Sequence, residues 1–399
     1  MRKTRLPRTV FALAAVSLLT DASSEMIYPL LPLFLSSVLG ASATALGAIE
    51  GAAESVAALL KLGSGVWSDR LTRRKPLVVF GYALASAVRP LIGLAQSAWQ
   101  VGALRVTDRI GKGIRTSPRD ALIADAVQPS QRGAAFGLHR AGDHLGGVLG
   151  PVLAFTLLQL FGFSLRTVFL LAAIPAALSL LVLIAGVREE ARRSAHDGGV
   201  RIGEPTALGS EFWKYLSVLF LFALGNASDA FLLLRASALG VAAAHVPLLW
   251  AAHHVVKAIA NVRGGALSDR IGRRPLIVAG WAVYAIVYLA FARASTAWHV
   301  WTLFLGYGLY FGLTEGVEKA FVADLVPERL RGSAYGWFNF TLGLAAFPAS
   351  LIFGVLWDKR GPTTAFGLAA VLAAAASVLL LVMVRGRGRG RPVAQASTA

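Results

Sequence analysis

Apolar runs of membrane-spanning length recur twelve times along this chain of 399 residues, and they limit its fold more than any other feature. Each run is near the ~20 residues that a helix needs to cross a bilayer. The runs cover residues 9–39, 45–67, 76–96, 99–127, 133–159, 166–187, 212–237, 245–267, 275–294, 297–325, 333–357 and 364–384. Only 15% of the residues are charged and the mean hydropathy is +0.63, which leaves too little charge for a water-facing surface. The sequence therefore predicts an all-α membrane protein with twelve transmembrane helices.

Basic residues account for the net charge of +18, and they gather in alternate connectors between the apolar runs. The basic segments are residues 2–8, 70–75, 188–193, 270–274 and 385–391. The connectors at 40–44 and 95–100 contain no lysine or arginine. By the positive-inside rule we expect a multi-pass protein of the plasma (inner) membrane with both termini in the cytoplasm. A nucleic-acid partner is not expected, because no soluble domain is available to present a basic face.

Several kinds of chemistry are excluded by the residues and motifs that the chain lacks. It has 0 cysteines, so it offers neither thiolate metal ligands nor a cysteine nucleophile. It also lacks a phosphate-binding loop, a nucleophile elbow and a zinc-spacing motif. We therefore expect no enzyme activity, no cofactor and no metal site.

The chain repeats itself at an offset of about 200 residues. The segment 65–70 is echoed by 265–270, and 132–137 is echoed by 331–336. Internal symmetry of this kind is expected of transporter folds.

The repeat predicts two pseudo-symmetric halves of six helices each. The halves are residues 1–187 and 212–384. Residues 188–211, rich in charge and glycine, are expected to form a cytoplasmic linker, and residues 385–399 are expected to form a basic cytoplasmic tail.

The paired motifs resemble the signature G-x-x-x-D-R-x-G-R-R/K of the major facilitator superfamily, and the resemblance extends over essentially the whole chain. The second copy is complete, whereas the first has Thr72 where glycine is usual. The resemblance implies the fold of that family, in which the first and fourth helices of each half line a central cavity. It also implies a cytoplasmic gate. The gate residues by this correspondence are Gly65, Asp69, Arg70, Arg73, Gly265, Asp269, Arg270, Gly272 and Arg273.

Two further motifs resemble those of proton-coupled members of the family. Arg109-x-x-x-Gly113 in the fourth run is similar to an arginine motif associated with proton transfer. The fifth run resembles the glycine-rich antiporter motif, although Ala154 and Phe155 replace its closing glycine pair. The matching residues are Gly137, Gly146, Gly150 and Pro151. In motif pattern the chain is closest to drug/proton antiporters, which implies H⁺ as the coupling ion.

The fourth run also carries a stripe of basic residues at steps of three and four, which places them on one helical face. The stripe consists of Arg105, Arg109, Lys112, Arg115 and Arg119. Charge inside a bilayer is costly, so these residues are candidates for function, and guanidinium groups bind anions through bidentate hydrogen bonds. The alternative is that Thr116-Ser-Pro118 breaks the helix and leaves Arg115 and Arg119 near the cytoplasmic mouth.

Carboxylates on the first two spans are candidates for proton coupling. Asp21 and Glu25 lie one helical turn apart on the first span, and Glu50 and Glu54 share a face of the second. Such a group can take up a proton while the substrate competes for the same arginine. The alternative is that Asp21 or Glu54 only neutralises an arginine of the fourth run as a static buried pair.

The remaining candidates lie on the fourth, fifth, seventh and tenth spans. They are Asp108, His139, Arg140, Asp143, Asp229 and Glu315. Histidine titrates near physiological pH and is suited to relaying protons, with plain packing as the alternative. Asp143 and His144 are adjacent and are expected to point to different faces, which argues against a metal site there.

These observations predict a monomeric secondary transporter in the lipid bilayer that moves a small organic solute, anionic or amphipathic, by alternating access. The glycine motif favours proton-coupled antiport and efflux. The alternatives are a proton-coupled uptake symporter and a transporter-like receptor that binds a ligand without transporting it.

Overall fold

The computed structural model describes residues 6–69, 71–128, 131–189, 208–327 and 330–384, and these form twelve helical spans. The first six are α1 (Arg8–Ile27) continued by η1 (Tyr28–Leu30), α2 (Leu31–Leu33) and η2 (Phe34–Val38); α3 (Ala43–Asp69); α4 (Lys75–Val88) continued by η3 (Pro90–Leu94); α5 (Ala98–Asp125); α6 (Arg132–Gln159); and α7 (Leu165–Leu171) continued by α8 (Ala173–Gly186). The second six are α9 (Ser210–Gly225) continued by α10 (Ala230–Ala238); η6 (Ala243–His245) with α11 (Val246–Ile271); α12 (Arg273–Arg293); α13 (Ala297–Leu325); α14 (Arg331–Arg360); and α15 (Pro362–Met383).

The all-helical, twelve-span prediction is confirmed, and the helix ends lie within a few residues of those expected. The alternative in which Thr116-Ser-Pro118 breaks the fourth span is wrong, because α5 continues through Pro118 to Asp125. Packing against α3 supports the helix where the proline removes a backbone donor: the Ser117 hydroxyl donates to the carbonyl of Lys61 at 2.8 Å. The predicted linker and tail lie largely outside the described residues.

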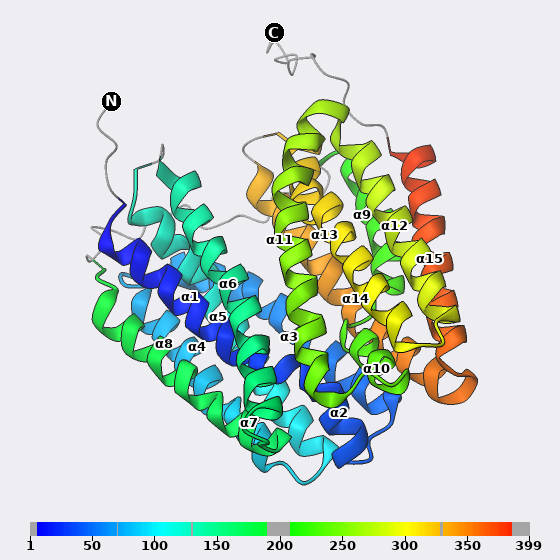
Figure 1. Ribbon diagram of the computed structural model, residues 1–399. Helices are drawn as coiled ribbons and strands as arrows, with labels where there is room; N and C mark the ends of the chain where they lie inside the picture. The colour runs from blue at the N-terminus through cyan, green and yellow to red at the C-terminus, as the bar shows by residue number, and fades with distance from the viewer. Residues whose placement is uncertain (1–5, 70, 129–130, 190–207, 328–329, 385–399) are drawn as a thin grey trace.

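The spans form two groups that meet at one end of the molecule and diverge toward the other (Figure 1). The diverging end, where α1 begins and α15 ends, is called the termini end; the opposite end is called the closed end. Between the groups, α3 packs along α14 and α6 packs along α11. At the closed end the Asp358 carboxylate on α14 accepts hydrogen bonds from the backbone N–H groups of Ala43 (3.1 Å) and Thr44 (2.8 Å) at the start of α3.

Three of the spans are more polar than the rest. Within the described residues, nine helical spans are long and apolar enough to cross a membrane, and α5, α11 and α13 are not among them. These three helices contribute charged side chains to the central cavity described below. The charged side chains that line this cavity face away from lipid, which makes them less costly in a membrane.

Glycines let neighbouring helices approach until their backbones touch. On α3, a Cβ at Gly51 would lie 2.9 Å from the Cα of Phe347 on α14. On α6, Gly142, Gly146 and Gly150 follow one another at four-residue steps against α1, and a Cβ at Gly146 would lie 2.9 Å from the Cβ of Asp21. Small residues permit close van der Waals packing, which holds helices together in lipid, where the hydrophobic effect does not act between them.

Two glycines of the same helix should therefore respond differently to an added methyl group. Gly146→Ala is expected to lower the free energy of unfolding by about 1–3 kcal/mol, because overpacking forces α6 away from α1. Gly137→Ala is the matched control, since nothing lies within 4 Å of its Cβ position, and it should stabilise α6 by up to ~1 kcal/mol. Unfolding in mixed micelles of rising SDS content measures both. Equal effects of the two substitutions would contradict close packing at Gly146.

Candidate functional site

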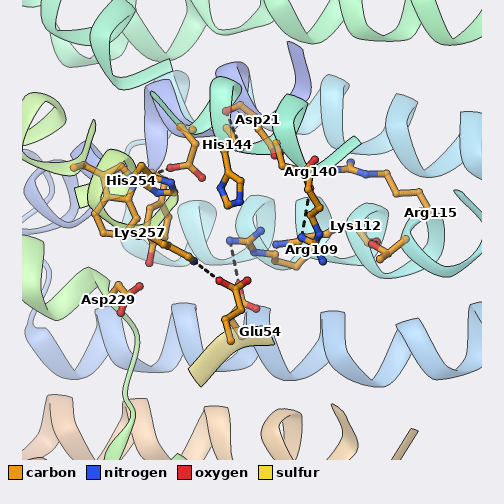
Figure 2. A pocket seen from close by; sticks show the side chains of 18 of the residues that line it. Asp21, Glu54, Arg109, Lys112, Arg115, Arg140, His144, Asp229, His254 and Lys257 are labelled. Carbon is orange, nitrogen blue, oxygen red and sulfur yellow. Dashed lines mark hydrogen bonds and ion pairs between the residues drawn. The ribbon is translucent and has the colours of Figure 1, made fainter. Parts of the chain in front are cut away.

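A cavity of about 520 Å³ lies between the two halves and is lined mainly by charged side chains. Figure 2 shows Arg109 and Lys112 from α5, Glu54 from α3 and Lys257 from α11 directed toward the same space. All but three of the predicted coupling residues line it, and these are Asp21, Glu25, Glu54, Arg105, Arg109, Lys112, Arg115, Arg140, Asp143, Asp229 and Glu315. The other three, Glu50, Asp108 and His139, are buried behind its wall.

Two buried ion pairs support the wall of the cavity. The Arg105 guanidinium donates to both carboxylate oxygens of Glu50, at 2.7 and 3.0 Å, and both side chains are almost fully buried. Arg89 on α4 pairs with Asp108 at 2.8 Å and also donates to the carbonyl of Thr20 on α1. Glu50 and Asp108 therefore fix helices in place rather than facing the cavity, whereas Glu54, which the static alternative names, pairs with Arg109 and has an exposed side chain.

Arg89 was missed by sequence reasoning. Its signal was an arginine inside the third apolar run, followed by Pro90, where a charge is as costly as on the fourth.

Arg109 and Lys112 present their charges to the cavity itself. Arg109 pairs with Glu54 at 3.1 Å, and the Glu54 side chain is 41% exposed, whereas that of Glu50 is 1% exposed. Arg109 Nε is buried without a hydrogen-bond partner in the described structure. Lys112, one turn further along α5, makes no ion pair or hydrogen bond with its side chain among the described residues, and Lys257 pairs with Glu315 at 3.4 Å.

The C-terminal part of the basic stripe, Arg115 and Arg119, is largely shielded from solvent. Arg115 is 5% exposed and lines the cavity, with its guanidinium 4.2 Å above the ring of Tyr82. Its Nε and Nη1 have no hydrogen-bond partner in the described structure. Arg119 pairs with Asp120 at 2.8 Å. The helix break in that alternative is absent, because α5 stays helical through Pro118, and Arg115 is buried in the wall of the cavity.

Carboxylates of α1, and Asp229 just before α10, also line the cavity. The Glu25 carboxylate accepts a hydrogen bond from the indole N–H of Trp250 on α11 at 2.7 Å, which links the two halves. Asp229 accepts one from the Tyr307 hydroxyl at 2.6 Å. Asp21 lines the cavity and makes no hydrogen bond or ion pair with its side chain among the described residues.

Trp250 was also missed. Its signal was a tryptophan inside an apolar run rather than at the end of one, where aromatic belts form.

The face of α6 toward the cavity carries Asp143 and His144 together. Asp143 accepts a hydrogen bond from Ser17 and lies 3.4 Å from Arg140 and 3.6 Å from His139. Asp143 and His144 both line the cavity although they point to different faces of the helix. Adjacent helical positions differ by only ~100°, and the cavity wraps around that much of α6.

An ion pair at the termini end involves a motif connector in each half. Arg74 lies 2.5 Å from Asp125, and Arg273 lies 2.5 Å from Asp324. The two pairs correspond when the halves are aligned on the prolines that follow, Pro76 and Pro275.

Only some of the predicted gate residues are described in full. Gly272 has a φ of +95°, a conformation that favours glycine, and Arg73 is exposed. Asp69, Gly265 and Asp269 are described only as parts of their helices, and Arg70 lies outside the described residues. The assignment of a gate to these residues therefore stays a prediction.

Comparison with known proteins assigns the chain to one family. A family model described as Major Facilitator Superfamily matches residues 13–347 and 216–398. An MFS-type transporter of Methanocaldococcus jannaschii is 35% identical over 374 residues, which cover 92% of this chain and 93% of the relative. The chain belongs to the major facilitator superfamily, a class of membrane transporters.

More distant relatives have named cargoes. A gentisate transporter of Corynebacterium glutamicum is 26% identical over 89% of this chain and 83% of the relative. Multidrug resistance protein MdtH of Escherichia coli is 24% identical over 84% of this chain and 82% of the relative.

Solved structures agree on the fold. A bacterial homologue of the human lysosomal transporter Spinster, crystallised in an inward-facing and unoccupied conformation, superimposes with a TM-score of 0.72 at 18% identity and covers 96% of both chains.

The contrast between the two glutamates of α3 can be tested directly. Glu50→Gln removes the bidentate partner of the buried Arg105 guanidinium and leaves it only the longer contact with Asp108 at 3.6 Å, so it should lower the free energy of unfolding by about 3 kcal/mol. Glu54→Gln is the matched control, because its pair with Arg109 is solvated and should cost less than about 1 kcal/mol. Unfolding of both variants in mixed micelles measures the difference, and a larger loss for Glu54→Gln would refute the division into supporting and cavity-facing pairs.

Proposed function

We propose that this transporter carries small organic anions and that anion binding is coupled to proton binding on the cavity carboxylates. The observation that carries the proposal is the solvated Arg109–Glu54 pair beside Lys112, whose ammonium has no ion-pair partner among the described residues. Fixed cations with unused donors, held in a cavity between the halves, are the arrangement that binds a carboxylate or a similar group.

The same pair supplies a route to proton coupling. When Glu54 is ionised, it occupies the guanidinium of Arg109 and reduces the positive charge of the cavity. A proton on Glu54 or on the unpaired Asp21 removes one negative charge and frees donors for an incoming anion. Proton and anion then favour each other's binding, and this positive linkage is what a symporter requires.

The position of the cavity suits alternating access. The cavity lies between two groups of helices that meet at the closed end and diverge at the termini end (Figure 1). Rocking of one half against the other, with the α3–α14 and α6–α11 contacts as the sliding surfaces, would expose it to each side in turn. We place the termini end in the cytoplasm of a cell with a plasma (inner) membrane, on the basis of the basic connectors.

One relative bears on the cargo and another on the direction of transport. Gentisate is an aromatic carboxylate, and the relative named for it favours an anionic cargo. The resemblance to antiporters and the relative MdtH favour proton-driven efflux as the second candidate, and the close α1–α6 contact through Gly146 and Gly150 is the feature that supports it. The sign of the coupling separates the two, since a symporter moves protons and anion together and an antiporter moves them in opposite directions.

Transport assays on the purified protein in liposomes test the proposal. With an acidic exterior, labelled benzoate or gentisate should accumulate inside faster than in protein-free liposomes, whereas a labelled aromatic cation should not. Arg109→Gln should lower the initial rate at least about tenfold, because one charge-assisted contact to the anion is lost. Lys359→Gln is the control, because Lys359 is exposed at the closed end of α14.

Three outcomes are informative. Anion accumulation driven by the inward proton gradient supports symport, and anion release driven by the same gradient supports antiport. Carriage of the cation alone would contradict an anionic cargo.

A further inference from the structure

A second cavity of about 740 Å³ opens beside the first, toward the termini end, and is called the vestibule. Its walls come from α3, α5, α6, α13 and the first turns of α14. It shares Lys61, Thr116, Asp120 and Arg140 with the central cavity, so the two spaces are continuous. A solute that enters from the termini end therefore meets the vestibule before it reaches Arg109.

One wall of the vestibule is aromatic. It consists of Tyr335, Trp337, Phe338 and Phe340 on α14. The Trp337 ring packs edge-on against Trp213 at 5.2 Å and against Phe340 at 5.6 Å, which fixes its orientation. Its indole N–H is buried and has no acceptor in the described structure. A buried donor without an acceptor is costly, so this position favours a ligand that brings one.

Two lysine side chains line the vestibule, one from each half. Lys61 on α3 and Lys319 on α13 come from opposite halves and both line the vestibule, and their charges repel each other. Neither side chain makes an ion pair or a hydrogen bond among the described residues. Of the other charged groups there, Asp120 is held by Arg119 and Arg140 by Asp143.

We propose that the vestibule is a second binding site, distinct from the central cavity, for an anion that carries an aromatic body. The anionic group lies between Lys61 and Lys319, and the ring system packs on the wall formed by Trp337 and Phe340. The aromatic wall selects for apolar area, and the two ammonium groups select for negative charge. This inference rests on the proposed transport of organic anions and adds the class of anion.

The site also gives the anion a role in closing the termini end. Alternating access requires the halves to approach there, which brings Lys61 and Lys319 closer together. Without an anion between them, their repulsion opposes the approach. A bound carboxylate attracts both ammonium groups and outweighs their repulsion, so occupation of the vestibule promotes closure.

Equilibrium dialysis of labelled 2-naphthoate against the purified full-length protein in nanodiscs tests the site, with the uptake by empty nanodiscs subtracted. The wild-type protein should bind a first equivalent in the central cavity and a second in the vestibule. Trp337→Ala and Lys319→Gln should each weaken the affinity for the second equivalent about tenfold and leave the affinity for the first unchanged. Arg109→Gln should weaken the affinity for the first equivalent and leave that for the second unchanged.

Matched controls separate local effects from general damage. Trp298→Ala removes an indole that is 71% exposed, and Lys359→Gln removes an exposed ammonium at the other end of α14; both should retain the two equivalents. If naphthoate binds only through Arg109 and is indifferent to Trp337 and Lys319, the vestibule site is refuted and the proposed function stands. If the wild-type protein binds no naphthoate at all, both are refuted.

Discussion

The cost of placing charge inside a bilayer governs this structure. The fourth span alone carries five basic residues between Arg105 and Arg119, and hydrocarbon cannot solvate them. The fold meets this cost in two ways: it surrounds α5 with other helices, and it provides carboxylates from α1, α3 and α6 close to the stripe. The close backbone contacts through glycine, the division into two halves and the polar cavity between them all serve to keep these charges away from lipid.

The two carboxylate–arginine pairs between α3 and α5 differ in burial. This difference separates the pair that stabilises the fold from the pair that is proposed to take part in transport. Glu50 holds Arg105 where water does not reach, so breaking that pair would leave a buried guanidinium with only the longer contact to Asp108. Glu54 lies one helical turn away and holds Arg109 at the surface of the cavity, where a proton or an anion can replace one partner. One helix face thus carries a structural pair and an exchangeable pair side by side, and the proposed coupling depends on the second.

Sequence patterns predicted the spans, the repeat and most of the cavity residues, because apolar length and intramembrane charge report directly on the bilayer. They did not separate Glu50 from Glu54, since burial depends on which neighbouring helix covers each side chain. They also missed Arg89 and Trp250, whose partners Asp108 and Glu25 lie on other helices. The alternative of a helix break at Pro118 was wrong for the same reason, because contact with α3 outweighs the helix-breaking preference of proline.

The central claim is that proton and anion favour each other's binding in the cavity around Arg109. Isothermal titration of benzoate into the purified protein, repeated in buffers with different enthalpies of ionisation, measures the number of protons taken up or released for each anion bound. Net uptake of protons that disappears when Glu54→Gln and Asp21→Asn are combined is the expected result. Binding with no proton movement, or with proton release, would contradict the claim.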